Sequence, residues 1–211
     1  GAEFVDTFHG DGGTLDGIID KLPYLSQLGI TAIWVTPVYE NIAAAGNSEP
    51  YHYYWPQNFE RIDARLLDGS NLPNSVQKST FAKFIDACNA KEIKVVLDMV
   101  VNHAGYQAQG HFGAGWFNTG GSGDIKGELS GLPDFNHDNP EVLDYFINNI
   151  RDWMKKGKVS NIRMDTLKHV EPRVWHYFKT QIRGAFPDTY LLGEVLSERK
   201  EDIKDLLEYQ N

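Results

Sequence analysis

The stretch from residue 161 to residue 170 carries charges where a strand is expected to run into a loop. It reads NIRMDTLKHV and brings together Arg163, Asp165, Lys168 and His169. Burying charged groups without partners costs a large amount of free energy. We therefore expect these side chains to pair with one another, or with groups from other strands, around a site.

Polar side chains also follow two other predicted strands. They are Asp98, Asn102 and His103 in and after KVVLDMVV, and Glu194 after YLLG. Active sites of parallel sheets wrapped by helices are assembled at the carboxyl ends of the strands. Each residue alone would also fit a solvated loop or a satisfied ion pair, but convergence from several strands favours a functional site.

Two carboxylates beside a guanidinium suit acid and nucleophile chemistry. Arg163 lies two residues before Asp165 and so on the same side of the strand, where its charge is expected to keep Asp165 ionised by lowering its pKa. Glu194 ends an apolar run, where loss of solvent is expected to raise its pKa and keep it protonated. Glycoside hydrolysis uses such a pair, and a separation of roughly 5 Å indicates retention of configuration.

Helical and strand-like patterns alternate along the chain. The helical patterns cover residues 15–28, 81–88, 140–154, 172–182 and about 197–207, and the strand-like runs cover 2–6, 30–35, 94–101, 159–164 and 190–194. Such alternation predicts a parallel α/β sheet wrapped by helices, either doubly wound or closed into a (β/α) barrel. The long connections 36–78 and 102–138 follow strands, where barrel enzymes place binding loops.

Capping residues predict where several helices begin and end. Ser79 or Thr80 is expected to cap the second helix. Asn139 is expected to cap a later helix that has Pro140 at its first position and ends at Gly157. Pro172 is expected to open the helix that follows.

The composition narrows the class of partner. The chain has 211 residues, of which 41% are hydrophobic and 23% charged, as in an ordinary globular protein. Its net charge is −9 and it has no basic run, which argues against nucleic acid as a partner. The same charge is compatible with a neutral ligand such as a sugar. Cys88 is the single cysteine, so neither an internal disulfide nor a cysteine metal cluster is expected. We expect no membrane span, and the start GAEFVDTF lacks a signal-peptide pattern, so any leader would have been removed.

Four blocks resemble the characteristic blocks of the α-amylase family of glycoside hydrolases and transglycosylases, in the correct order. They are DMVVNH (98–103), LPDFNH (132–137), IRMDTLKHV (162–170) and LLGEV (191–195), and GITAIWVTPV and YHYYWPQNF resemble the second strand and its following loop. The resemblance implies a partial (β/α)8 TIM barrel of about five strand–helix units. Residues 1–103 would form its first part, 104–138 a short inserted domain, and 139–211 the continuation through the fifth unit.

The resemblance also assigns roles to individual residues. Asp165 would be the nucleophile, Glu194 the general acid/base, and Arg163 the partner of the nucleophile. The remaining positions would bind substrate or support the site: His103 and Tyr54 at the reacting sugar, Lys168 and His169 on the leaving-group side, and Asp98 against Arg163. The implied activity is retaining hydrolysis of α-1,4 links in α-glucans or maltooligosaccharides, with transglycosylation or cyclomaltodextrinase-like action as the alternative.

A structural calcium ion is a further implication of the resemblance, although some family members bind none at this place. Asn102 would be a ligand together with the carbonyl of His169, and Asn136 or Asp134 would join them, since oxygen ligands suit calcium. In the insert, Trp116 and Phe117 would either extend the sugar cleft or pack the insert's own core.

The sequence also departs from the family pattern. It lacks the block of the VDNHD kind that carries the family's third catalytic carboxylate, and strands six to eight are not in this chain. The chain is therefore expected to be inactive alone: a fragment, a piece completed by a second chain or copy, or a non-catalytic sugar-binding unit. Tyr53 stands where Gly is common and is expected to crowd the subsite, and Ser160 and Asn161 replace the usual Asp-Gly. Family analogy suggests an extracellular or periplasmic protein.

Overall fold

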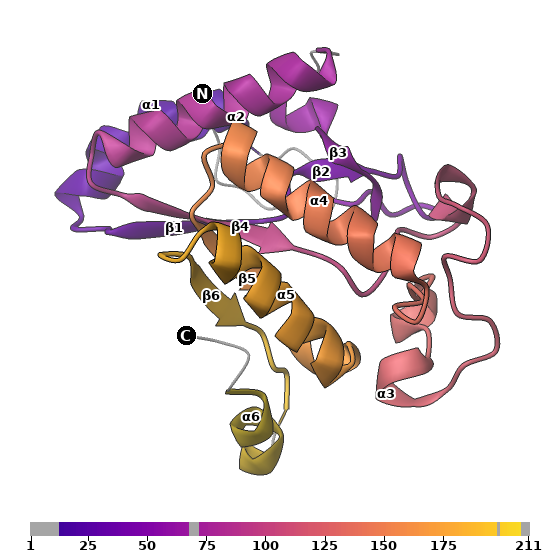
Figure 1. Cartoon of the computed structure of the whole chain (residues 1–211). Helices are drawn as coiled ribbons and strands as arrows, with labels where there is room; N and C mark the ends of the chain where they lie inside the picture. Colours follow the sequence, from indigo (N-terminus) through magenta and orange to yellow (C-terminus); the bar gives the residue numbers. More distant parts are fainter. Residues whose placement is uncertain (1–12, 68–71, 198, 208–211) are drawn as a thin grey trace.

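Four parallel strands form the central sheet of the protein (Figure 1). Their order across the sheet is β1 (Ala32–Val35), β4 (Lys94–Met99), β5 (Asn161–Met164) and β6 (Tyr190–Gly193). The computed structural model describes residues 13–67, 72–197 and 199–207, so the strand expected at 2–6 lies outside the described residues. For the other four units, the prediction of a parallel sheet with alternating helices, as in a partial (β/α) barrel, is confirmed.

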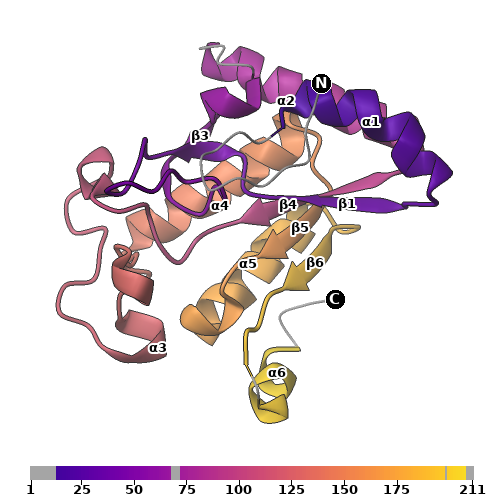
Figure 2. The same cartoon turned by 180° about the vertical axis from the view of Figure 1, so that it is seen from behind.

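Helices cover one face of this sheet. They are α1 (Leu15–Gln27), α2 (Asn74–Asn89), α4 (Pro140–Lys156) and α5 (Pro172–Ala185). In Figure 1, α4 and α5 lie in front of β5 and β6, and in the reverse view of Figure 2 they lie behind them. Apolar strand residues on this side, such as Leu97, Ile162 and Leu191, are buried. None of the helices in the described part of the chain has both the length and the apolar character of a membrane span.

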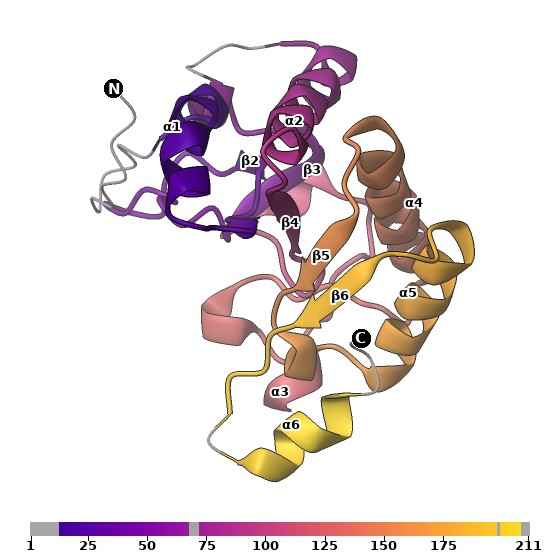
Figure 3. The same cartoon turned by 90° about the vertical axis from the view of Figure 1, so that its left-hand side faces the viewer.

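The opposite face of the sheet carries the alternate residues of each strand. Trp34 of β1 and Tyr190 and Leu192 of β6 are exposed there, while Asp98 and Arg163 lie between them, buried and paired in register. Strand side chains alternate between the two faces. The charged residues of β4 and β5 therefore belong to the face that α4 and α5 do not cover. Figure 3 shows β5 and β6 beside these two helices.

Two of the predicted helix starts are confirmed. The side chain of Asn139 accepts the N–H of Glu141, Pro140 is the first residue of α4, and Gly157 is the C-cap that follows its last residue, Lys156. Pro172 opens α5. The prediction of a cap at Ser79 or Thr80 is wrong, because α2 begins at Asn74 after Pro73. Its first turn has a single apolar residue, Val76, and so no apolar periodicity. The hydroxyl of Thr80 donates within the helix to the carbonyl of Val76 at 3.0 Å.

The last helix also begins later than expected. Helix α6 covers Lys200–Leu206, whereas the pattern placed its start near Ser197. Residues 194–197, which follow β6, are not helical. The difference is about one helical turn, which is within the usual uncertainty of helix boundaries.

The first long connection contains an antiparallel hairpin. Strands β2 (Tyr39–Asn41) and β3 (Pro56–Ile62) pair with each other, followed by the 3-10 turn η1 (Ala64–Leu67). The side-chain amide of Asn41 donates to the carbonyls of Tyr39 and Tyr53, and its oxygen accepts the N–H of Trp55. One buried side chain thus fixes the loop that carries Tyr54.

The second long connection, residues 104–138, has little regular structure. It contains η2 (Ala108–His111), the four-residue α3 (Gly123–Lys126) and η3 (Leu129–Gly131). Phe117 stacks on Phe135 with ring centroids 4.6 Å apart, and Trp116 stacks on Phe112. Phe135 in turn contacts Phe146 of α4. Of the two alternatives for Trp116 and Phe117, the contacts therefore favour packing of the insert. The boundaries of the insert as a domain stay a prediction.

Candidate active site

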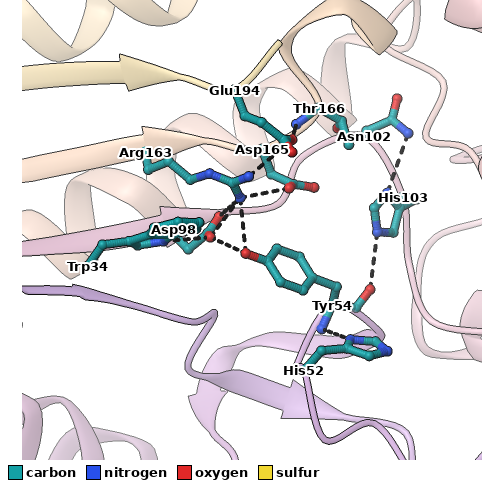
Figure 4. A network of polar contacts seen from close by, with 10 residues as sticks. All are labelled: Trp34, His52, Tyr54, Asp98, Asn102, His103, Arg163, Asp165, Thr166 and Glu194. Carbon is teal, nitrogen blue, oxygen red and sulfur yellow. Dashed lines mark hydrogen bonds and ion pairs between the residues drawn. The ribbon is translucent and has the colours of Figure 1, made fainter. Parts of the chain in front are cut away.

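The guanidinium of Arg163 binds three carboxylates from three strand ends (Figure 4). Its Nη1 donates to Oδ1 and Oδ2 of Asp98 at 2.8 and 2.7 Å and to Oδ1 of Asp165 at 2.8 Å. Its Nη2 lies 3.0 Å from Oε2 of Glu194. Because both nitrogens belong to one guanidinium, Asp165 and Glu194 lie side by side. We call Asp98, Arg163, Asp165 and Glu194 the acid cluster.

The sheet ladder places these residues. Asp98 and Arg163 are register partners on β4 and β5. Beyond the last paired residues, the N–H of Asp165 donates to the carbonyl of Met99 at 3.0 Å, and the N–H of Glu194 donates to the carbonyl of Met164 at 2.9 Å. Backbone hydrogen bonds thus extend the parallel pairing by one residue at each strand end. The convergence expected from the sequence follows from this parallel geometry.

Two aromatic side chains complete the surroundings of Asp98. The hydroxyl of Tyr54 donates to Oδ2 of Asp98 at 2.6 Å and accepts from Nη1 of Arg163 at 3.1 Å. The indole Nε1 of Trp34 donates to the same Asp98 oxygen at 2.9 Å. Tyr54 is half-buried, so its ring is held beside the acid cluster with one part accessible.

The pKa of Asp165 contradicts the expectation from sequence. Burial, followed by the neighbouring charge of Asp98, raises the pKa of Asp165 to about 7, although Arg163 acts in the opposite direction. The expectation paired the charge of Arg163 with Asp165 alone, whereas three carboxylates share this guanidinium. Among the described residues, Oδ2 of Asp165 is buried and has no hydrogen-bond partner.

Glu194 is more accessible than its apolar preceding residues suggest. About 38% of its side chain is exposed, so the expectation of a desolvated carboxyl is wrong. Besides Arg163, its Oε2 accepts the backbone N–H of Thr166 at 3.0 Å. Thr166 adopts a left-handed conformation (φ 49°, ψ 45°), which is uncommon for a β-branched residue. This conformation directs its N–H toward the Glu194 carboxylate.

His103 is buried beneath the Tyr54 loop. Its Nε2 lies 3.1 Å from the carbonyl of Tyr54, and its Nδ1 lies 3.4 Å from the side-chain nitrogen of Asn102. Burial lowers the pKa of His103 to about 4, which keeps the ring neutral at ordinary pH. A carbonyl only accepts hydrogen bonds, so the proton of the neutral ring belongs on Nε2.

Lys168 and His169 follow the acid cluster in the short turn η4 (Leu167–His169), and both are half-buried. The Nδ1 of His169 lies 2.8 Å from the carbonyl of Asp124 in α3. The N–H of Leu167 donates to the carbonyl of Glu194 at 2.9 Å. These contacts tie the turn to both the insert and the strand end that carries Glu194.

The oxygen groups expected to hold calcium fit a hard cation at two positions. Among the described residues, Oδ1 of Asn102 is buried without a hydrogen-bond partner. Asp134 is also buried, with its pKa raised to about 6 by burial. Its Oδ2 accepts from Nδ2 of Asn118 at 2.8 Å, and it lies next to Asn102 because Asp134 forms an antiparallel bridge with His103. The Oδ1 of Asn136 instead accepts the N–H of Asp138 at 3.1 Å. In the described part of the chain, no cluster of three or more His, Cys, Asp or Glu could hold a metal.

Sequence reasoning missed two contributors to this site. Residues 30–35 were interpreted only as a strand, without a role for Trp34, and Thr166 was not considered. Strand alternation would have placed Trp34 on the face of Asp98 and Arg163, given the register of β1 against β4. The backbone N–H of Thr166 carries no signal in the sequence.

Comparison with known proteins identifies the family. The profile of the alpha-amylase catalytic domain matches residues 1–118, more than half of the chain. The chain belongs to the alpha-amylase family. Within the alpha-amylase family, it is 30% identical over 210 residues to the maltogenic alpha-amylase of Bacillus acidopullulyticus and 29% identical over 211 residues to neopullulanase 2 of Thermoactinomyces vulgaris. Each match covers 90% of this chain and 33% of the relative.

A solved structure of the alpha-amylase family has the same fold. The alpha-amylase of Geobacillus thermoleovorans, determined in complex with acarbose, superposes with a TM-score of 0.83 at 30% sequence identity. The match covers 99% of this chain and 46% of that structure. The fold is therefore part of the alpha-amylase barrel, and the chain spans about a third of the length of the curated relatives it matches.

Proposed function

We propose that the site serves retaining hydrolysis of α-1,4-glucosidic bonds in α-glucans. The observation that carries this proposal is the pair of carboxylates, Asp165 and Glu194, held side by side by one guanidinium at the ends of neighbouring strands. Membership of the alpha-amylase family supports the same reaction class. The substrate and the linkage are part of the proposal.

In the first step, Glu194 donates its proton to the glycosidic oxygen while the carboxylate of Asp165 attacks the anomeric carbon. The bond to the leaving sugar breaks, and an ester between the remaining glycosyl group and Asp165 forms. Glu194, now ionised, then removes a proton from water, which attacks the same carbon and releases Asp165. Two inversions give net retention. Asp165 must be ionised to attack, and Arg163 opposes the effect of burial on its charge.

The neighbouring residues would position the sugar. We assign Tyr54 to stacking beneath the reacting sugar, since its hydroxyl is anchored on Asp98 and the ring is thereby fixed. His103, which is buried with its ring nitrogens beside Tyr54 and Asn102, would support the subsite by holding the Tyr54 loop. Lys168 and His169 would line the leaving-group side. Asp98 holds Arg163 and has no role in bond breaking. If calcium binds, Asn102 and Asp134 would hold it, and the ion would supply structural support between the insert and the strand end.

The face of the sheet that α4 and α5 do not cover exposes large apolar side chains, which supports the packing of other strands on it. Trp34, Tyr190 and Leu192 are exposed there, on the two outer strands. A parallel sheet in a barrel is covered on both faces. We propose that further barrel strands cover this face, either in a longer form of the polypeptide or from a second chain or copy, and that residues 1–211 alone do not turn over substrate.

The test measures release of reducing ends from maltoheptaose by the complete enzyme. Asp165→Asn and Glu194→Gln should each lower kcat by several orders of magnitude, because each removes a group that makes or breaks a bond. Asp86→Asn, at an exposed carboxylate paired with Lys158 on the outer surface, is the matched control and should leave turnover unchanged. Unchanged turnover in Asp165→Asn would contradict the assignment of Asp165 as the nucleophile.

A second candidate is transglycosylation or cyclomaltodextrinase-like action. It is favoured by the names of two further relatives, a cyclomaltodextrinase of Geobacillus thermopakistaniensis and a cyclomaltodextrin glucanotransferase of Klebsiella oxytoca. Both reactions share the glycosyl–Asp165 ester and differ in whether water or a sugar hydroxyl accepts the glycosyl group. Products longer than maltoheptaose would support transglycosylation, and preferential opening of cyclodextrin would support cyclomaltodextrinase action. If the complete protein binds sugar but does not turn it over, both catalytic proposals are wrong and the chain is part of a non-catalytic sugar-binding protein.

A further inference from the structure

Trp34 makes two contacts to the acid cluster from the neighbouring strand. Its Nε1–H donates to Oδ2 of Asp98 at 2.9 Å, and the centre of its ring lies 4.7 Å from Cζ of Arg163 (Figure 4). Although 54% of the residue is exposed, its polar hydrogen is directed at a fully buried carboxylate. A large aromatic residue at an exposed position of a strand is therefore engaged with both members of the Asp98–Arg163 pair.

The hydrogen bonds within the cluster are unevenly distributed. Asp98 accepts from Trp34, from the hydroxyl of Tyr54 and from Arg163, so both of its oxygens have donors. Asp165 accepts from Arg163 through Oδ1 alone, and among the described residues its buried Oδ2 has no partner. Donors stabilise the charged form of a carboxylate. The geometry thus favours negative charge on Asp98 over negative charge on Asp165.

The cluster also carries more acids than bases. From the elements packed against Asp165, the groups that face it are Asp98 of β4, Arg163 of β5, Glu194 after β6 and Tyr54 of the loop before β3. Three carboxylates around one guanidinium have a net charge of −2 if all are ionised. Close carboxylates titrate as a coupled set, in which one retains its proton to higher pH.

We propose that Trp34 is a positioning residue that keeps the Asp98 carboxylate charged and fixed on Arg163, so that the proton retained by the coupled Asp98–Asp165 pair resides on Asp165. Burial raises the pKa of Asp98, while the charge of Arg163 and the hydrogen bonds from Tyr54, Arg163 and Trp34 lower it. Burial and the charge of Asp98 raise the pKa of Asp165 to about 7. Trp34 acts through Asp98 and has no contact with the reacting atoms in the proposed reaction.

The consequence for catalysis rests on the proposed function. Asp165 has to lose its proton before it attacks, so Trp34 would set the pH at which the nucleophile becomes available. The placement of the proton itself involves no substrate. It can therefore be measured on residues 1–211, whether or not the hydrolysis proposal holds.

The experiment follows the side-chain carboxyl carbons of aspartate by NMR as a function of pH, in the chain labelled with carbon-13. Asp98→Asn and Asp165→Asn assign the two buried resonances. In Trp34→Phe, which keeps an aromatic ring but removes the N–H donor, the titration midpoint of Asp98 should rise by about one pH unit. The midpoint of Asp165 should fall, because Asp98 now takes up the proton at higher pH and its charge no longer opposes ionisation of Asp165.

Tyr190→Phe is the matched control, since Tyr190 is an exposed aromatic on the same sheet face at the opposite outer strand. It should leave both midpoints unchanged. Circular dichroism establishes that the variants are folded. Unchanged midpoints in folded Trp34→Phe would overturn the proposal, as would an Asp165 that titrates below Asp98 in the unsubstituted chain.

Two further measurements keep the inference testable. If Trp34→Phe does not fold, hydrogen exchange of the Trp34 indole N–H in the unsubstituted chain replaces it. Slow exchange supports the bond to Asp98, and exchange as fast as that of a free indole refutes it. In the complete enzyme, Trp34→Phe should shift the pH dependence of kcat and leave KM within twofold. Absence of turnover together with the expected titrations would refute the proposed function and leave the role of Trp34 standing.

Discussion

Arg163 donates from one terminal nitrogen to both oxygens of Asp98, at 2.8 and 2.7 Å, and both side chains are buried. The two residues are register partners on adjacent parallel strands, so the backbone itself aligns them. Arg163, fixed in this way by Asp98, also binds Asp165 and Glu194. Its integrity should therefore govern both the stability of the chain and the protonation of the acid cluster.

Replacement of Arg163 by Met should destabilise the chain strongly near neutral pH. It leaves three clustered carboxylates without a counter-charge, a defect that typically costs about 3–5 kcal/mol. The loss should shrink as the pH falls, because the carboxylates become protonated and no longer need a cation. Urea unfolding at neutral and acidic pH measures both effects. Arg173→Met, at an exposed arginine paired with Asp138, is the control and should change the unfolding free energy by less than about 1 kcal/mol.

Asp165→Asn should stabilise the chain at alkaline pH. A carboxyl whose pKa is raised to about 7 in the folded protein, from 3.8, binds more protons folded than unfolded between these values. Its contribution to stability is therefore fully present below pH 4 and is lost as the pH rises through 7. Asparagine removes this dependence. The difference in unfolding free energy between variant and parent should grow from pH 4 to pH 8, and a constant difference across that range would contradict the raised pKa.

Thr166→Gly should preserve or raise stability, by up to about 1 kcal/mol, because glycine adopts the left-handed conformation without steric cost. The Oγ1 of Thr166 is also buried without a partner among the described residues, so nothing that bonds it is lost. The N–H that holds Glu194 remains. Thermal unfolding measures the change. Thr189→Gly is the control, since the hydroxyl of Thr189 donates to the carbonyl of Phe186 at 2.9 Å, and it should be destabilising.

Calcium should raise the melting temperature of the chain if the site at Asn102 and Asp134 binds it. A ligand that binds only the folded state at a hundredfold excess over its Kd stabilises by about 2.7 kcal/mol. Asp134→Asn should abolish the effect, because it removes a charged oxygen ligand, whereas Asp86→Asn should retain it. Magnesium at the same concentration is the control for a general effect of ionic strength on the melting temperature. No shift with calcium would remove this ion from the proposal.

The elements with strong local signals were predictable from the sequence. Helix α4 has an Asn cap, a first-position Pro and a regular apolar stripe, and the structure has it at the expected residues. The start of α2 was missed, because its first turn has no apolar periodicity and tertiary packing decides it. The pairing of β2 with β3 was missed as well, since a three-residue strand within a long polar connection carries no clear pattern.

The candidate site was predictable in its membership and less so in its electrostatics. Parallel strands bring their ends together, so the meeting of Arg163, Asp165 and Glu194 followed from topology. The pKa of Asp165 did not, because it depends on burial and on Asp98, which occupies the same guanidinium. The donor Trp34 was overlooked because the apolar run at residues 30–35 indicates a strand but does not indicate which of its side chains faces Asp98.

Tyr53 was expected to crowd the subsite beside Tyr54, and the structure contradicts this. Its side chain is buried, and the guanidinium carbon of Arg65 lies 5.5 Å from the centre of its ring. Its φ of 63° is the left-handed value that glycine adopts freely, which explains why glycine suits this position. The buried side chain of Tyr53 therefore fixes the backbone next to Tyr54, which a glycine would leave freer. If Tyr54 stacks on a sugar as proposed, its ring is already held in one orientation, and little conformational entropy is lost on binding.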